Sequence, residues 1–111
     1  MSTIIDELTK ILKQRKTASS KESYVASLHA QGINKILEKV GEEAIETIIA
    51  AKEHDQKVDQ SRKAVIHETA DLWFHTMVML SHLDLEPNQV LEELEKRFSI
   101  SGLEEKAARQ N

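Results

Sequence analysis

The chain has 111 residues, the length of one domain, and 40% of them are hydrophobic, while three Gly, one Pro and few aromatic residues are typical of a helical protein. The formal net charge is -4 and the chain has no long basic run, so its charge pattern gives little support to nucleic-acid binding. The absence of cysteine excludes disulfides and thiolate metal sites. The longest mostly apolar stretch, about residues 72–80, is too short to span a membrane, and the first residues lack the basic start and apolar core of a secretory signal.

These features predict an all-α protein in the cytoplasm, with four to five helices in a single domain and no nucleic-acid or membrane partner. The first predicted helix carries an amphipathic pattern of five residues: Ile4, Ile5, Leu8, Ile11 and Leu12. The polar run at residues 13–21 is predicted to be a loop or arm. Residues 1–22 are therefore expected to be an N-terminal helix and loop, and residues 23–111 the main part of the domain.

Ser19 and Glu22 have the spacing of a capping box, which predicts a short helix over residues 23–31 that ends at Gly32. The third helix is predicted over residues 34–54. Its expected inner face consists of five residues: Ile36, Leu37, Val40, Ala44 and Ile48. Gly41 within this helix suggests a close approach by a ligand or a neighbouring helix.

A loop at residues 54–57 leads to a fourth helix, predicted over residues 58–83 and closed by residues 84–86. Pro87 then occupies the first turn of a fifth helix. The apolar stripe of the fifth helix is expected to contain Val90, Leu91, Leu94 and Phe98. Four large side chains of the fourth helix are interpreted as core or subunit interface: Trp73, Phe74, Met77 and Met79.

Five carboxylates in two clusters are the most informative feature of the sequence. Glu42-Glu43-x-x-Glu46 on the third helix is followed, after 21 residues, by Glu68-x-x-Asp71 on the fourth. At helical spacing, the members of each cluster project from nearby positions on one helix. Without these five charges the rest of the chain would be slightly positive, so the acidity is local.

The surroundings of the two clusters are apolar. Residues 44–51 contain Glu46 as their only charge, and residues 69–80 contain Asp71 as their only acid. Crowded, buried carboxylates are unfavourable unless they take up protons or a cation. Oxygen ligands at this density suit Mg²⁺, with Mn²⁺ as a possible substitute, and Mg²⁺ often completes its shell with phosphate oxygens. We therefore expect a phosphate-bearing substrate.

Two other interpretations of these residues remain. The acids can be solvated helix faces that pair with Lys35, Lys39 and similar neighbours. His67, Asp71 and His75 also recur at one-turn spacing, which allows a transition-metal site. However, an Asp stands where the zinc-protease pattern needs its second His, and the sequence contains no Glu-x-x-His, so the histidine site is disfavoured.

Basic residues near the acids or in the C-terminal segment are candidates for phosphate contacts: Lys35, Lys39, Lys106 and Arg109. The sequence offers no phosphate-binding glycine loop and no serine nucleophile motif. A water activated by a metal or a carboxylate is therefore the expected nucleophile.

The two acidic motifs resemble the signature of the all-α nucleotide pyrophosphohydrolases, the MazG-like superfamily, which cleave nucleotides between the α and β phosphates with magnesium. Four further segments, residues 23–28, 32–44, 70–75 and 101–106, are similar to the phosphoribosyl-ATP pyrophosphohydrolase family of histidine biosynthesis. This similarity spans about residues 23–109. It implies an all-α NTP pyrophosphatase-like fold completed by homodimerisation. It also implies the stand-alone form of the enzyme, without a fused cyclohydrolase.

The resemblance implies hydrolysis of 1-(5-phosphoribosyl)-ATP to 1-(5-phosphoribosyl)-AMP and pyrophosphate. The expected catalytic residues are the five acids: Glu42, Glu43, Glu46, Glu68 and Asp71. All of them except Glu42 are expected to bind Mg²⁺, and Glu42 is expected to support them from outside the metal shell. A house-cleaning nucleoside triphosphate pyrophosphohydrolase and a non-catalytic helical interaction protein are the alternatives.

Overall fold

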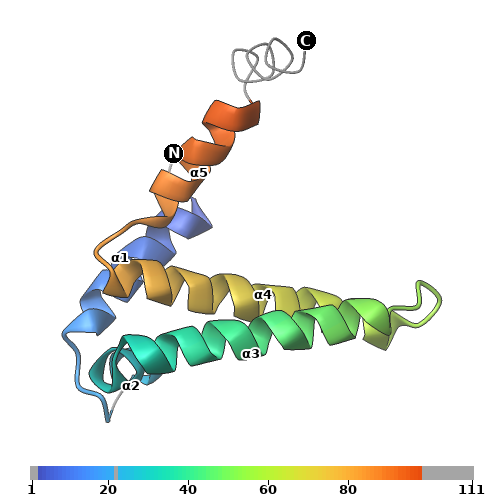
Figure 1. Ribbon diagram of the computed structural model, residues 1–111, viewed down its shortest axis with the longest axis horizontal. Helices are drawn as coiled ribbons and strands as arrows, with labels where there is room; N and C mark the ends of the chain where they lie inside the picture. The colour runs from blue at the N-terminus through green and yellow to red at the C-terminus, as the bar shows by residue number, and fades with distance from the viewer. Residues whose placement is uncertain (1–2, 22, 99–111) are drawn as a thin grey trace.

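The computed structural model describes residues 3–21 and 23–98, and within these ranges it contains five helices and no strand (Figure 1). These helices are α1 (Ile4–Lys16), α2 (Tyr24–Gln31), α3 (Ile33–Lys52), α4 (Asp59–His82) and α5 (Pro87–Phe98). The predicted all-α class is confirmed. None of the described helices is both long and apolar enough to cross a membrane.

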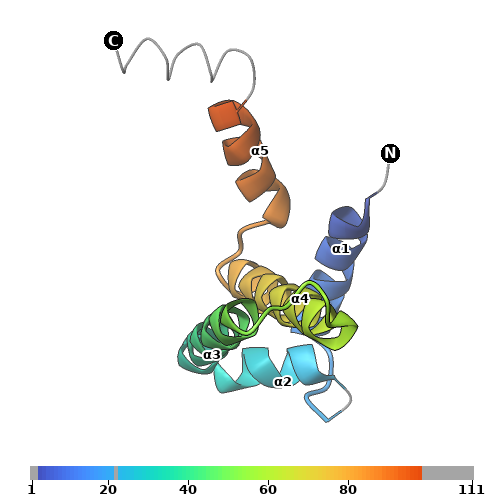
Figure 2. The ribbon, with the colours of Figure 1, turned by 90° about the vertical axis from the view of Figure 1, so that its right-hand side faces the viewer.

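The fold is organised around α3 and α4, which run side by side in opposite directions (Figure 1). α2 packs against α3, and α1 crosses α4 near its C-terminal end, whereas α5 projects away from the helix pair (Figure 2). The buried core lies where the first four helices meet and contains six apolar residues: Leu12, Val25, Leu28, Ile36, Met77 and Val78. This core fixes one end of the α3–α4 pair and leaves the other end to the two long helices alone.

α1 extends as far as Lys16, into the first part of the predicted loop at residues 13–21, so the predicted end of the first helix was wrong, whereas residues 17–21 are outside any helix, as predicted. Lys13 and Lys16 in its last turn bind carboxylates of the α4–α5 connection, at 2.5 Å from Glu86 and 2.6 Å from Asp84. Lys16 also donates to the carbonyl oxygen of Ser81 at 2.8 Å. Basic side chains at a helix C-terminus also interact favourably with the helix dipole, so the first part of the polar run continues the helix.

The second helix has the predicted range but a different cap. Ser23 is buried at the N-cap, and its Oγ accepts from the backbone N–H of Ala26 at 3.2 Å. Ser19 Oγ instead accepts from the backbone of Lys21 in the preceding turn. The predicted Ser19–Glu22 capping box is therefore wrong for Ser19, and Glu22 lies outside the described residues.

The predicted ranges of the third and fourth helices are confirmed to within two residues, and the fifth helix starts at Pro87, as predicted. After α4 the chain turns through Asp84, which has a positive φ of 60°. The backbone N–H of Asp84 donates to Ser81 and that of Leu85 donates to Leu80, at 3.1 and 2.8 Å. This is the Schellman arrangement, and it closes α4 before Pro87 starts α5.

Part of the predicted inner face of α3 is exposed. Ile36 is fully buried, but Leu37 and Ile48 are 45% and 66% exposed, because no described element of the chain covers that side of the helix. The apolar stripe of α5 and Trp73 of α4 are exposed as well, whereas Met77 is buried and Phe74 and Met79 pack against the core. A Cβ added at Gly41 would meet nothing within 4 Å, so no described helix approaches it closely.

Candidate active site

The acidic residues lie near the middle of the α3–α4 pair, the first cluster on α3 and the second on α4. Thr47 connects the two helices at this level. Its hydroxyl oxygen lies 2.7 Å from the carbonyl oxygen of Glu43 and 3.0 Å from that of Glu68, both within hydrogen-bond distance. One side chain thereby fixes the position of the first cluster relative to the second.

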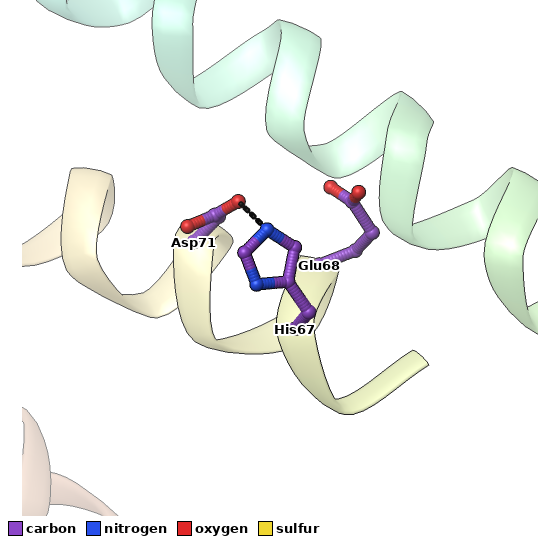
Figure 3. A group of neighbouring side chains, drawn as sticks. All are labelled: His67, Glu68 and Asp71. Carbon is purple, nitrogen blue, oxygen red and sulfur yellow. Dashed lines mark ion pairs between the residues drawn. The ribbon is translucent and has the colours of Figure 1, made fainter. Parts of the chain in front are cut away.

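Three acids converge on one point. One carboxylate oxygen from each of Glu43, Glu46 and Glu68 lies within 4.8 Å of the other two. Glu68 belongs also to a second group with His67 and Asp71, whose ligand atoms satisfy the same distance. Figure 3 shows Glu68 pointing toward α3, while His67 Nε2 pairs with Asp71 at 3.2 Å along α4. Four of the five predicted acids are thus brought together, and Glu68 links the two groups.

Burial raises the pKa of Glu43, contact with Glu46 and the charges of Glu46 and Asp71 raise it further, and His75 opposes this shift. Burial is also the largest cause that raises the pKa of Glu68, followed by contact with Glu46 and its charge. Both shifts have the same physical origin, since a carboxylate that loses water and gains negative neighbours holds its proton more tightly. The acids are therefore strained when they are all charged.

The donor atoms fit a hard divalent cation. Glu43 is only 7% exposed, and its Oε2, like Oε2 of Glu68, is buried without a hydrogen-bond partner in the described part of the chain. Unpartnered buried carboxylate oxygens are unfavourable and are expected to bind a proton or a cation. Oxygen-only donors from Glu43, Glu46 and Glu68 match the preference of Mg²⁺ and Mn²⁺.

Lys39 lies beside the acids, whereas Lys35 pairs with Glu38. Lys39 Nζ is 3.1 Å from Glu42 Oε2 and 3.7 Å from Glu43 Oε1. Hydrogen bonding to Glu42 is the largest cause that raises the pKa of Lys39, and the same contact lowers the pKa of Glu42. Lys35 pairs with Glu38 at 3.6 Å. The ion-pair interpretation therefore holds for Glu42 and for one oxygen of Glu43, whereas neither Glu46 nor Glu68 pairs with a basic side chain in the described part of the chain.

The prediction that the clustered acids are buried holds for Glu43 and is wrong for Glu46, which is exposed. Glu68 and Asp71 are half-buried. The difference arises because α3 turns Glu43 toward α4, while Glu46 emerges three residues later at the open edge of the helix pair. Two predicted phosphate contacts, Lys106 and Arg109, lie outside the described residues.

A contact between α2 and α4 was missed in the sequence. The hydroxyl of Tyr24 lies 2.9 Å from Nε2 of the buried His75, and Nδ1 of His75 lies 2.9 Å from the carbonyl oxygen of Asp71. A carbonyl only accepts, so Nδ1 of His75 donates to it, while Nε2 and the Tyr24 hydroxyl share the second hydrogen bond. His75 therefore faces α2 instead of joining His67 in a metal site. The one available signal was a polar residue in an apolar segment, which must find partners.

Comparison with known families gives a match that covers most of the chain. The family model described as phosphoribosyl-ATP pyrophosphohydrolase matches residues 5–98. The matched range includes all five helices except the first residue of α1, and it contains both acidic clusters.

Proposed function

The chain belongs to the phosphoribosyl-ATP pyrophosphohydrolase family, a family of hydrolases in histidine biosynthesis, and from this premise we propose that its acidic cluster cleaves 1-(5-phosphoribosyl)-ATP with Mg²⁺. The products are 1-(5-phosphoribosyl)-AMP and pyrophosphate. The requirement for Mg²⁺ is proposed because the carboxylates of Glu43, Glu46 and Glu68 converge, and two of their oxygens are buried without a hydrogen-bond partner among the described residues.

Glu43, Glu46, Glu68 and Asp71 would hold the cation between the two long helices. When bound, Mg²⁺ would offset the negative charge that develops on the departing pyrophosphate, and Mn²⁺ would serve as a substitute. Thr47 supports this arrangement, because it holds the backbone of Glu43 close to that of Glu68.

The reaction needs a nucleophile and an acceptor for its proton. Water attacks a phosphorus of the α–β anhydride, the P–O–P bond breaks, and the attacking water gives its proton to a carboxylate of the cluster. Burial and the neighbouring acids raise the pKa of Glu43 and of Glu68 in the metal-free chain, which favours the binding of a cation between them. Glu42 supports the site indirectly by holding Lys39 beside Glu43.

Positive charge near the acids would bind the phosphates. Lys39 is the best placed of the candidates because its ammonium group lies at the edge of the cluster. Lys35 lies one turn earlier on α3. Lys106 and Arg109 complete the proposed set of phosphate and phosphoribosyl contacts on the basis of sequence alone.

The direct test measures pyrophosphate release from enzymatically made phosphoribosyl-ATP, with Mg²⁺ and with a chelator. ATP and other nucleoside triphosphates are assayed beside it. Release that requires Mg²⁺ and phosphoribosyl-ATP supports the proposal. Preferential turnover of other triphosphates would assign a house-cleaning role, and no turnover of any compound would support a binding protein.

Glu46→Gln is expected to lower turnover at least 100-fold while the helical content stays unchanged, because loss of a metal ligand removes several kcal/mol of transition-state stabilisation. Glu38→Gln is the matched control, since Glu38 lies on the same helix and pairs with Lys35 outside the cluster. Wild-type activity of Glu46→Gln would contradict its assignment as a metal ligand.

We also propose that the chain forms a homodimer through the uncovered side of α3. Leu37, Ile45 and Ile48 are exposed there, and Leu37 and Ile48 point away from Glu46 at helical spacing. Light scattering coupled to size-exclusion chromatography is expected to give twice the chain mass. Ile48→Asp should shift this mass toward the monomer, and a wild-type monomer at assay concentration would refute the proposal.

A further inference from the structure

A pair of histidines joins the end of α2 to the end of α4, away from the acidic cluster. His29 lies in the last turn of α2, and His82 is the last residue of α4. Their Nδ1 atoms are 2.9 Å apart, their ring planes are inclined by only 15°, and both side chains are half-buried. His82 lies about three helical turns from Asp71, or roughly 16 Å along α4, so the pair is separate from the proposed metal site.

The short distance between the two Nδ1 atoms restricts the protons of the pair. One proton lies between these nitrogens, so one ring donates and the other accepts. Nε2 of His29 is buried and has no hydrogen-bond partner in the described part of the chain. Because a buried N–H without a partner is unfavourable, His29 donates through Nδ1 and keeps Nε2 free of a proton, while Nδ1 of His82 accepts.

One further proton conflicts with this arrangement. If the contact between the Nδ1 atoms is kept, the extra proton leaves an N–H on Nε2 of both rings, and that of His29 is buried without a partner among the described residues. If both Nδ1 atoms are protonated, two donors face each other at 2.9 Å. Burial, and then the charges of His82 and Lys16, lower the pKa of His29, in agreement with this conflict. The contact therefore favours the neutral pair.

Charged groups of two other elements face the pair. Lys16 of α1 donates to the carbonyl oxygen of Ser81 at 2.8 Å and pairs with Asp84 of the α4–α5 connection at 2.6 Å. Lys16 is the main cause that lowers the pKa of Asp84, and the charge of a protonated His82 contributes to the same shift. No described charged side chain of α3 is among the causes that lower the pKa of His29. Lys16 therefore opposes a proton on His29, whereas Asp84 attracts one on His82.

We propose that the His29–His82 pair is a pH-sensitive latch, which holds the end of α2 against α4 while the pair is neutral and opens when His82 takes up a proton and turns toward Asp84. The inference concerns the scaffold and does not rest on the proposed function. α2 has only 8 residues, and a helix of this length depends on its tertiary contacts. Its first turn is held separately, by the Ser23 cap and by the contact of Tyr24 with α4. Opening of the latch therefore frees the last turn of α2 and leaves the first turn in place.

Nuclear magnetic resonance of the ¹⁵N-labelled full chain between about pH 8 and pH 5 tests the latch. The imidazole nitrogen shifts give the tautomer of each ring, and hydrogen exchange gives the protection factor of the Gly32 amide, which donates to Leu28 at the end of α2. We expect the Nδ1–H form of His29 at high pH and a common midpoint of protonation for both rings. The Gly32 protection factor should fall about threefold to tenfold through this midpoint, as for one net hydrogen bond. An Nε2–H form of His29, separate midpoints, or constant protection of Gly32 would overturn the proposal.

Two variants test the parts of the latch. His82→Phe keeps a ring but removes its nitrogens, and His54→Phe is the matched control because His54 is exposed between α3 and α4. His82→Phe should lower the Gly32 protection factor already at high pH and abolish its pH dependence, whereas His54→Phe should change neither. Asp84→Asn keeps the turn, since Asn tolerates the positive φ of 60°, and should move the midpoint of the pair to lower pH. Wild-type protection and pH dependence in His82→Phe, or an unchanged or raised midpoint in Asp84→Asn, would refute the latch.

Discussion

Glu43→Gln removes one charge from the centre of the acidic cluster and keeps the shape of the side chain. Burial and Glu46 raise the pKa of Glu43, so the folded-state pKa lies above the unfolded one. The unfolding free energy contributed by this group therefore falls as the pH rises from the unfolded pKa through the folded pKa. Gln avoids this loss, and its amide can donate to the carboxylate of Glu46 or Glu68.

The expected magnitude has two parts. A hydrogen bond to a charged acceptor is worth about 1.5–3 kcal/mol, and 1 kcal/mol shifts Tm by roughly 4–8 °C in a domain of this size, so the metal-free variant should melt at least about 5 °C higher. Mg²⁺ at 100 times its Kd stabilises the wild type by about 2.7 kcal/mol. That corresponds to a rise of roughly 10–20 °C, most of which the variant should lose.

The assay is thermal unfolding of the wild type and variant, each with Mg²⁺ and with chelator. Glu38→Gln is the control, because it makes the same change on the same helix at a residue that pairs with Lys35 at 3.6 Å. It should keep the full magnesium effect. A lower metal-free Tm for Glu43→Gln, together with an undiminished magnesium effect, would refute both the strained cluster and the role of Glu43 as a ligand.

Three further predictions concern the scaffold. Thr47→Val should lower the unfolding free energy by about 1 kcal/mol and weaken Mg²⁺ binding, because the Thr47 hydroxyl joins α3 to α4. The control Thr76→Val loses a hydrogen bond within its own helix and should leave the Mg²⁺ affinity unchanged. Equal Mg²⁺ affinities of the two variants would contradict this role of Thr47. Burial and then neighbouring positive charges lower the pKa of His29 from its ordinary value of 6.5, so its contribution to stability should be complete above that pH and decline below it. Urea unfolding between about pH 7 and pH 5 should show a steeper loss of unfolding free energy for the wild type than for His29→Asn. Parallel pH profiles of the two proteins would refute this prediction. Ser23→Ala should lower the unfolding free energy measured with denaturant by about 1 kcal/mol, because it removes the N-cap of α2, and Ser19→Ala should lower it much less. The reverse order would support the capping box predicted from the sequence.

The sequence by itself predicted the features that depend on neighbours along the chain. Helical spacing of apolar residues located α3 and α4 to within two residues, and Pro87 marked the start of α5. The spacing Glu43-x-x-Glu46 placed two acids on one helix, and the motifs around them indicated the family that the comparison then matched. The end of α1 was missed because its polar last turn is stabilised by Asp84 and Glu86, which are distant in sequence.

Only the tertiary structure decided which of these side chains are strained. Glu43 is buried and Glu46 is exposed, although both stand in the same motif, because burial depends on the angle at which α3 meets α4. His75 shows the same division. Its hydrogen bond to the backbone of Asp71 lies within one turn of α4, whereas its hydrogen bond to Tyr24 forms only because α2 packs near α4. Helix formation follows from local spacing, but desolvation, and with it the raised pKa of Glu43, follows from the packing of segments that are far apart in the chain.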